Sequence, residues 1–509
     1  MSSSTPDRSA RRAGRDAFSR SLRAQWAAFR SSRGRVLAMA ASVLITVSIG
    51  LLIAGGARST CVTSKGEGVC PAPLTGPDGT AVRDRYYFVH QPLTGNGVIT
   101  ARVSDMTGQM RLPDAVPGVR NVKEGVVPWA KAGLLVRQSL TQGTPYAAVM
   151  ITGGHGVRMQ HNFVHDVAGG PVRGPVWLRL TRTGDTVTGH ESPDGRRWTE
   201  VGTVTLPGLP RTVEIGMFTT SPGVLWQTAK AFAQATATFD RIELRGANGS
   251  WRRDDVGVSL GPDGRTPHHP GGVAESGDRL VVTGSGDIGP ATVEGGLRAD
   301  LMLAGGALGL VPVLVAMVSF IAAGHPRGPA GTGPEAGSRP ARLPAAKVVV
   351  AGAVAFVTGL VASGVVVPVG LALLRANRNP VQPITMGTGL RVVIGHAALT
   401  AAVAVLALGL AALAGRRVVA AGLAVALVVV PHLVAAAGLA PWLPAVTPAA
   451  GFAITQSVPS FAHVDVNRSL LGGHHPLPPW AGLAVTCAYA ALILVLGAAA
   501  AARRGRASR

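Results

Sequence analysis

An uncharged apolar run from Val36 to Ala57 follows an arginine-rich leader and precedes a long polar region. A helix that crosses a bilayer needs about 20 apolar residues, because the hydrocarbon core is roughly 30 Å thick. A cleaved signal peptide is the alternative, since Gly55, Gly56 and Ala57 resemble a cleavage site. The run, however, exceeds an h-region of roughly 7 to 15 residues, and its leader is long. We therefore expect an uncleaved transmembrane helix here.

Five more apolar runs follow Asp300, and none contains Asp, Glu, Lys or Arg. Together with the first run they predict six transmembrane helices. Gly305 and Gly309 form a small-xxx-small pair that favours close packing of one helix on another. The five runs are Leu301 to Ala323, Val348 to Leu374, Val392 to Ala414, Val418 to Ala440 and Ala481 to Ala502.

The distribution of arginine predicts the direction of threading, because short loops rich in Lys and Arg stay in the cytoplasm. The leader, the linker between the second and third spans, the Arg416-Arg417 turn and the basic tail then all lie inside, which places both termini in the cytoplasm. One short outer loop with Arg375, Arg378 and Arg391 disagrees. The leader arginines are Arg8, Arg11, Arg12, Arg15, Arg20, Arg23, Arg30, Arg33 and Arg35.

The formal net charge of +22 raises the possibility of a nucleic-acid partner. Much of this excess flanks the apolar runs, where it orients the chain and meets anionic lipid head groups. We therefore expect membrane lipids and no nucleic acid as partners.

The long insertion between the first and second spans has the pattern of an all-β domain. Apolar and polar residues alternate in short segments separated by turns such as Thr183-Gly184-Asp185 and Pro193-Asp194-Gly195, which is typical of a sandwich or jelly roll. We expect Trp177 and Trp198 in its core. The expected strands include Lys131 to Arg137, Tyr146 to Ile151, Val157 to His161, Val176 to Arg182, Thr186 to His190, Thr199 to Leu206, Thr212 to Thr219 and Ala235 to Leu244.

The predicted fold is thus a multi-pass α-helical membrane protein with a large all-β jelly-roll sandwich inserted between helices 1 and 2. The predicted boundaries are residues 1–35 for a basic cytoplasmic leader with an amphipathic interfacial helix, 36–57 for helix 1, 58–298 for the extracytoplasmic domain with a sandwich core at about 84–245, 299–323 for helix 2, 324–347 for a cytoplasmic linker, 348–440 for helices 3 to 5, 441–480 for an extracytoplasmic loop with re-entrant short helices, 481–502 for helix 6 and 503–509 for a cytoplasmic tail.

Three stretches of the insertion resemble the concanavalin-like and laminin-G-like jelly rolls of bacterial extracellular proteins. They are AGLLVRQSLTQGTPYAAVMITGGHGVRMQ (Ala132 to Gln160), PVWLRLTRTGDTVTGHESPDGRRWTEVGTVTL (Pro175 to Leu206) and ATATFDRIEL (Ala235 to Leu244). That family usually has an aromatic residue where this chain has His190-Glu191. The departure argues against sugar stacking at this position. A glycan or cell-wall polymer is one candidate ligand of the sandwich, and the substrate and a partner protein are the others.

The remainder resembles permease subunits of ABC-2-type transporters from high-GC bacteria. The similar segments are LRAQWAAFRSSRGRVL (Leu22 to Leu37), LLRANRNPVQP (Leu373 to Pro383), VTPAAGFAITQSVP (Val446 to Pro459) and HPLPPWAGLAVTCAYAALILVLG (His475 to Gly497). The resemblance implies six helices, an N-terminal interfacial helix that meets a separate ATPase, and short re-entrant helices before the last span. Gln25 stands where such leaders often have glutamate, so one polar contact is expected to be missing.

The leader has the pattern of an interfacial helix. Phe18, Leu22, Trp26 and Phe29 recur at helical spacing on one face and arginines occupy the others, which predicts a helix lying at the head-group level. It serves either as coupling to an ATPase or as a plain anchor beside the first span. The chain has no GxxxxGK[ST] phosphate loop, and its GxGxxG match at Gly284 to Gly289 is expected to be a turn between strands. ATP and Mg²⁺ are therefore expected on a separate P-loop subunit.

Cysteine and histidine complete the candidate sites. Cys61 and Cys70 follow the first span closely, and an extracytoplasmic pair of this kind predicts a disulfide, with two free thiols as the alternative. Cys487 should be a small buried apolar residue of the last span. His155, His161, His165, His474 and His475 lack the tight spacing of a zinc site, so no metal is expected. His396 and His432 lie within spans near a helix end or turn, where they are either functional or structural.

No enzyme is expected on this chain, since acids such as Glu191 and Asp194 lie in a turn rather than facing each other, and no nucleophile elbow occurs. The resemblance to ABC-2-type permeases implies a permease subunit of the bacterial cytoplasmic membrane. It would move a substrate across the membrane, with export as the expected direction. Two permease subunits would form a homodimer or heterodimer, and a P-loop ATPase would bind to them. The alternative is a membrane-anchored receptor that binds a glycan or cell-wall polymer without transport.

Overall fold

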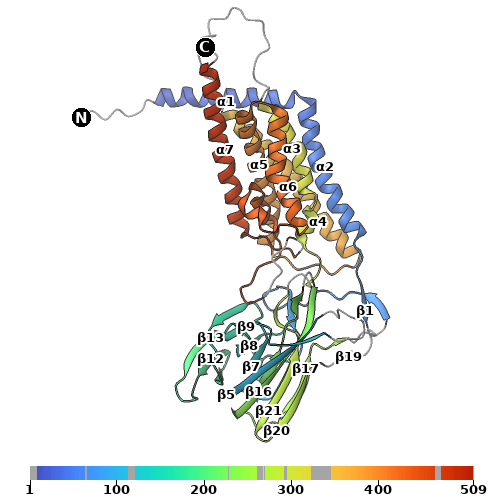
Figure 1. The fold of residues 1–509 in the computed structure, drawn as a ribbon, viewed down its shortest axis with the longest axis vertical. Helices are drawn as coiled ribbons and strands as arrows, with labels where there is room; N and C mark the ends of the chain where they lie inside the picture. Colours follow the sequence, from blue (N-terminus) through green and yellow to red (C-terminus); the bar gives the residue numbers. More distant parts are fainter. Residues whose placement is uncertain are drawn as a thin grey trace, which may run out of the picture.

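The computed structural model describes residues 8–63, 66–112, 121–226, 229–260, 267–268, 270–291, 295–321, 345–464, 470 and 472–507. Six helices within these ranges are long and apolar enough to cross a membrane, so the chain is a multi-pass membrane protein. One lies near the N-terminus, and five follow the β-rich region. Figure 1 shows the helices as a bundle with the β-sandwich at one end and with α1 and the end of α7 at the other.

The helices match the predicted spans to within a few residues at their ends. Proline lies inside three of them, at Pro312, Pro368 and Pro431, as is common where neighbouring helices satisfy the freed backbone groups. Among its described residues, the 441–480 segment contains two short 3₁₀ helices. The helices are α1 (Arg8–Arg30), α2 (Arg33–Gly56), η2 (Ala299–Leu303), α3 (Gly306–Ile321), α4 (Ala345–Ala376), α5 (Met386–Ala414), α6 (Arg417–Ala436), η3 (Leu443–Val446), η4 (Pro448–Thr455) and α7 (Pro479–Ala507).

The two glycines of the small-xxx-small pair lie against α2, as the sequence predicted for a close helix contact. A Cβ atom on Gly309 would lie 2.1 Å from Thr46 Oγ1 and 3.1 Å from the Ser42 carbonyl oxygen. One on Gly305 would lie 2.8 Å from Ile49 Cβ. Only a residue without a side chain lets the backbones approach this closely.

The β-region contains two large antiparallel sheets that pack face to face. Their inner faces enclose an apolar core with Val89, Leu134, Ile215 and Phe239 among its buried residues. The first sheet has seven strands in the order β10-β9-β8-β7-β14-β4-β17. The second has nine strands, with the order β13-β12-β11-β5-β16-β21-β20 and with β15 and β6 paired to β16 and β5.

The strands are β1 (Thr60–Thr63), β2 (Gly66–Val69), β3 (Val82–Asp84), β4 (Tyr86–Thr94), β5 (Gly97–Arg111), β6 (Val122–Glu124), β7 (Lys131–Arg137), β8 (Tyr146–Thr152), β9 (Val157–His161), β10 (His165–Ala168), β11 (Val176–Thr183), β12 (Thr186–Ser192), β13 (Thr199–Thr205), β14 (Thr212–Thr220), β15 (Val224–Trp226), β16 (Ala229–Arg245), β17 (Arg252–Val256), β18 (Ser259–Leu260), β19 (Pro267–His268), β20 (Gly272–Ser276), β21 (Arg279–Ser285) and β22 (Ile288–Pro290).

All eight strands named from the sequence are present, and the sandwich extends beyond the predicted range. The sheets include β17, β20 and β21, so that the β-region reaches residue 290 instead of 245. The GxGxxG segment is the expected turn, between β21 and β22, with Gly286 at φ +105°. A side chain there would collide with Arg85, whose Cβ lies 2.5 Å from the position of an added Cβ.

The prediction that Trp177 and Trp198 lie in the core is wrong. Both are half-buried on the outer face of the nine-stranded sheet, where Arg102 lies over Trp177 and Arg179 lies 3.8 Å from the centre of the Trp198 ring. Trp177 also packs against Gly195 of the neighbouring turn. The aromatic core is made instead by smaller rings such as Phe88 and Phe218.

Candidate functional site

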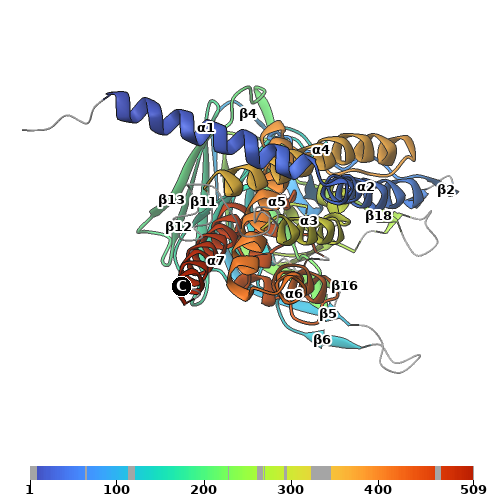
Figure 2. The same ribbon diagram turned by 90° about the horizontal axis from the view of Figure 1, so that it is seen from above.

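Helix α1 crosses the end of the bundle that lies away from the sandwich. Viewed from above, it runs over α4 and meets α2 (Figure 2). The chain turns a corner at Ser31 and Ser32, so α1 lies roughly across the axis of the transmembrane helices (Figure 1). A helix with an apolar face and an arginine-rich remainder favours this position at a membrane surface.

One aromatic residue fixes α1 to the bundle. Phe29 is 3 % exposed, and its ring meets Phe320 of α3 edge to face, with ring centres 5.2 Å apart. Arg35 of α2 lies over both rings and donates hydrogen bonds to the carbonyls of Ala28 and Phe29. Such edge-to-face and cation–π contacts add to the apolar burial.

Lys347 completes this group from the first turn of α4. Its Nζ lies 5.1 Å from the centre of the Phe320 ring and donates to the Ile321 carbonyl at 3.1 Å. We call Phe29, Arg35, Phe320 and Lys347 the aromatic corner. The aromatic corner brings α1, α2, α3 and α4 together at one point, so a displacement of α1 would change contacts with three transmembrane helices.

The four residues predicted to share one face of the leader differ in burial. Leu22 packs on the bundle core together with Phe29. Phe18 and Trp26 are 43 % and 49 % exposed, and Trp26 lies at the rim of a groove between α1 and α4. Gln25 Oε1 is buried without a hydrogen-bond partner among the described residues.

At the opposite end of the bundle, polar contacts connect the sandwich stalk to the helices. Asn377 and Asn379 lie just after α4. Asn377 donates to the Ala54 carbonyl at 3.0 Å, and Asn379 donates to the Ala57 carbonyl at 2.9 Å, both at the end of α2. Leu297 pairs with the chain at Val381 through a parallel bridge. The two links that lead from the membrane into the sandwich are therefore fixed to one loop.

A second set of contacts holds the segment after η4. Ser457 Oγ donates to Asp300 Oδ1 at 2.5 Å, and Asp300 also pairs with Arg298 at 3.3 Å. Arg391 of α5 donates to the carbonyls of Ile454 and Gln456 at 3.2 and 2.6 Å. Arg391 is one of the three arginines that disagree with the charge pattern, with Arg375 and Arg378, and it binds backbone carbonyls here.

The same segment reaches the sandwich through His463. Its ring nitrogen Nε2 donates to the Phe163 carbonyl at 3.1 Å, and its ring lies near Trp129 and Phe461. Phe163 is fully buried and has φ +71°, a conformation rare for a bulky residue. Contacts from Arg391 to His463 thus form a continuous connection from α5 to the sandwich.

The two histidines predicted within the spans lie in different surroundings. His396 lies in the interior of α5, not near its end as expected, and packs against Gly306 of α3. His432 stacks on Phe452 of η4, with ring centres 3.9 Å apart. The Nδ1 atom of each is buried and has no hydrogen-bond partner among the described residues.

The cysteines follow the prediction in part. Cys70 is disulfide-bonded, whereas the side chain of Cys61 lies outside the described residues, so its pairing stays a prediction. Cys487 is a free thiol but it is exposed on α7, which corrects the expectation that it is buried. A membrane helix exposes apolar residues to lipid, so apolar character does not predict burial there.

The described histidines of the sandwich that were considered for a metal site, His155, His161 and His165, have other partners. Among the described residues, no group of three or more His, Cys, Asp or Glu side chains is placed to hold a metal ion. His155 stacks on Trp129, and His161 stacks on His165 with ring centres 4.4 Å apart. His165 in turn pairs with Asp78 at 3.1 Å.

Stacking and burial make His161 sensitive to pH. Burial, reinforced by the neighbouring His165, lowers the pKa of His161 from 6.5 to about 4, although Asp78 acts in the opposite direction. Between these values the unfolded chain binds a proton that the folded chain does not, so stability falls as the pH is lowered through this window. We expect His161→Gln to flatten this dependence, measured as the thermal midpoint of the full chain in detergent from pH 7 to 4.5. An unchanged slope would contradict this role of His161.

The acids considered for catalysis have structural partners. Glu191 accepts a hydrogen bond from the Gly170 amide at 2.8 Å. Asp194 accepts from the amides of Arg196 and Arg197 at 2.9 Å each, and these bonds hold the pKa of its carboxyl well below its ordinary value. Asp194 thus stabilises the turn after β12, whereas Glu191 lies within β12 and holds the segment that follows β10.

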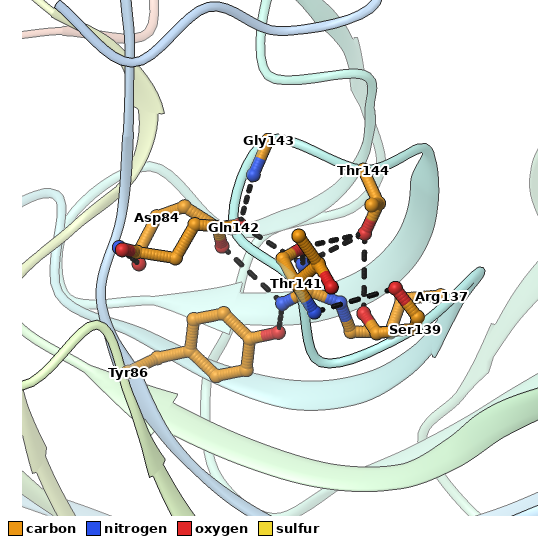
Figure 3. Close-up of polar contacts among 8 residues, drawn as sticks. All are labelled: Asp84, Tyr86, Arg137, Ser139, Thr141, Gln142, Gly143 and Thr144. Atoms are coloured by element: carbon orange, nitrogen blue, oxygen red, sulfur yellow. Dashed lines mark hydrogen bonds and ion pairs between the residues drawn. The ribbon is translucent and has the colours of Figure 1, made fainter. Parts of the chain in front are cut away.

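A buried ion pair joins β7 of the first sheet to the end of β3. The sequence did not predict it. Arg137 and Asp84 are both fully buried and pair at 2.9 Å, and Arg137 also reaches Tyr86 and Thr144 (Figure 3). The Gly143 amide donates to Asp84 at 2.8 Å, so the loop after β7 closes around the pair. All seven residues of β7 are buried, so the alternation expected there did not reveal that its last residue is buried.

Comparison with known proteins adds little to this description. No family model and no curated protein matches the chain. The structure is similar to a functionally unknown protein from Saccharomyces cerevisiae, with 14 % identity and a TM-score of 0.22 over 38 % of this chain and 87 % of that one. It is also similar to a mutant of the GH43 protein BlXynB from Bacillus licheniformis, with 12 % identity and a TM-score of 0.16 over 31 % of this chain and 27 % of that one.

These likenesses are too distant to carry an argument about activity. The architecture itself defines the class: a multi-pass membrane protein of six membrane-length helices with a β-sandwich domain between the first and the second.

Proposed function

We propose that the chain is the permease subunit of an ABC-2-type transporter, which exports a substrate across the bacterial cytoplasmic membrane with ATP hydrolysed by a separate subunit. The observation that supports this most is the placement of α1, which crosses the bundle end away from the sandwich and is fixed there through Phe29. The resemblance of the leader and of the last spans to such permeases agrees with this placement.

In this proposal α1 receives the motion of the ATPase and the aromatic corner passes it on. The corner contacts three transmembrane helices, so a force applied to α1 would tilt them together. Two permease halves, as a homodimer or heterodimer, would then rock about a path between them and expose it alternately to each side. ATP and Mg²⁺ would bind on the partner subunit.

The connection at the other end would let the sandwich respond to this motion. Arg391 of α5 holds the segment that reaches the sandwich through His463. A rearrangement of α5 would move the sandwich relative to the membrane. The sandwich would thereby act as a gate or a receptor for substrate or for a cell-wall ligand on the outer side.

The test uses Trp26, which is about half exposed on α1. We expect Trp26→Ala to lower ATP turnover of the reconstituted complex severalfold, because the ring packs along the groove between α1 and α4 and so helps to place α1 for the ATPase. Arg20→Ala, an exposed change on the same helix, is the control and should retain turnover. Equal turnover in Trp26→Ala and unmodified complexes would reject coupling through α1 and favour an anchored receptor without transport.

A further inference from the structure

The groove between α1 and α4 has a form that suits a lipid chain. Its volume is about 500 Å³, and its lining is almost entirely apolar. Leu22 and Trp26 contribute from α1, and Val350, Val354 and Val357 contribute from α4. The groove begins one helical turn from the aromatic corner, at the level where an interfacial helix meets the hydrocarbon of the bilayer.

The charged side chains that the structure describes around this groove are basic. Arg23 lies at its rim, and Arg35 and Lys347 belong to the adjacent corner. Helices α1, α2, α3 and α4 together contain a single acidic residue, Asp16. Among the described residues, Arg35 and Lys347 bind backbone carbonyls and aromatic faces, and neither forms an ion pair.

From these observations we propose that the groove binds one anionic phospholipid, with an acyl chain between α1 and α4 and its phosphate at Arg23. An apolar slot alone would accept any acyl chain, and an exposed arginine alone would attract any anion. The groove and the arginine together select a molecule with an acyl chain and an anionic group. Trp26 at the rim agrees with this, because tryptophan favours the level of the lipid head groups. The bound lipid would fill the space beneath α1 and hold it against α4.

This inference does not depend on the proposed function, because a lipid can hold α1 in place whether or not an ATPase binds there. It is tested with the full chain in mild detergent, to which dioleoylphosphatidylglycerol or dioleoylphosphatidylcholine is added. The two lipids have the same acyl chains, so a difference in retention reports on the head group. Native mass spectrometry counts the lipids that remain on each chain.

We expect about one phosphatidylglycerol to be retained per chain and phosphatidylcholine to be lost. Ala353→Trp fills the groove at an exposed position and should abolish retention. Arg23→Gln should weaken it about fivefold, the contribution of one arginine near an anionic surface. Two matched controls should retain the lipid: Val361→Trp, an exposed change further along α4, and Arg20→Gln, an exposed change outside the groove on α1.

Three results would overturn the proposal. Retention of phosphatidylglycerol by Ala353→Trp would exclude the groove as the site. Equal weakening by Arg20→Gln and Arg23→Gln would indicate diffuse attraction to a basic helix. Displacement of the lipid by inorganic phosphate would show that the site recognises a free anion. A thermal midpoint close to that of the unmodified chain ensures that the variants compared are folded.

Discussion

Replacing Asp84 by alanine is expected to destabilise the sandwich by about 3 to 5 kcal/mol, the usual cost of leaving one partner of a buried ion pair alone. Asp84 and Arg137 have no exposed side-chain surface. Once Asp84 is removed, water therefore cannot solvate the charged guanidinium of Arg137. Arg137→Ala should have an effect of the same size, because it leaves the Asp84 carboxylate with the Gly143 amide as its remaining partner in this loop. The measurement is the free energy of unfolding of the full chain in detergent, followed by tryptophan fluorescence.

The two positions should also depend on one another. A double variant, Asp84→Leu with Arg137→Met, should lose less stability than the sum of the two single alanine variants, because neither change leaves a charge unpaired. The matched control is the exposed pair Arg245 and Glu243, where alanine should change stability by less than about 1 kcal/mol. Additive losses at Asp84 and Arg137 would contradict the assigned pairing.

Replacing Phe29 by alanine is expected to release α1 from the bundle. A buried phenylalanine typically contributes about 3 to 5 kcal/mol over alanine, and Phe29 also carries the contacts with Phe320 and Arg35. The released helix should become a substrate for trypsin, since Arg23 and Arg30 are exposed but lie within the helix. The measurement is the rate of cleavage within α1 in mild detergent.

Phe18→Ala is the matched control, because Phe18 lies on the same helix but is 43 % exposed. It should leave the rate of cleavage unchanged. Cleavage of Phe29→Ala at the rate of the unmodified chain would mean that the aromatic corner does not hold α1.

The membrane helices could be predicted closely because bilayer thickness sets their length and the hydrocarbon excludes charge. Which face of each helix packs inward could not be predicted in the same way. Both protein neighbours and lipid accept apolar side chains, so Cys487 was expected inside and is exposed. Gly305 and Gly309 are the exception, because glycines at this spacing let two helix backbones approach closely and so mark a packed face.

In the sandwich, alternation predicted strands whose two faces differ in burial. β11 shows this pattern clearly, with alternately buried and half-buried residues. β4 was not named because it is buried on most positions of both faces and contains His90, Gln91 and Pro92. Trp177 and Trp198 were misplaced because a large aromatic ring can cover the outer face of a sheet when an arginine stacks on it.

The candidate sites depended on contacts between residues far apart in the chain, which a single sequence does not reveal. The pattern of α1 predicted that Phe29 faces apolar surroundings, but not that Phe320 is its partner or that Lys347 joins them. Arg391, like Arg375 and Arg378, disagrees with the charge rule because it lies in a loop predicted to be outside. Its contacts with Ile454 and Gln456 give the physical reason, because a basic residue that binds backbone carbonyls serves packing instead of orientation.

Purification of the tagged chain from its native membrane, with quantitative mass spectrometry of what accompanies it, tests the central claim most directly. The account predicts a P-loop ATPase in near-equal amount to this chain, and its loss when Phe29→Ala releases α1. Recovery of cell-wall material or signalling proteins without any ATPase would contradict the transporter assignment and make a membrane-anchored receptor the better description.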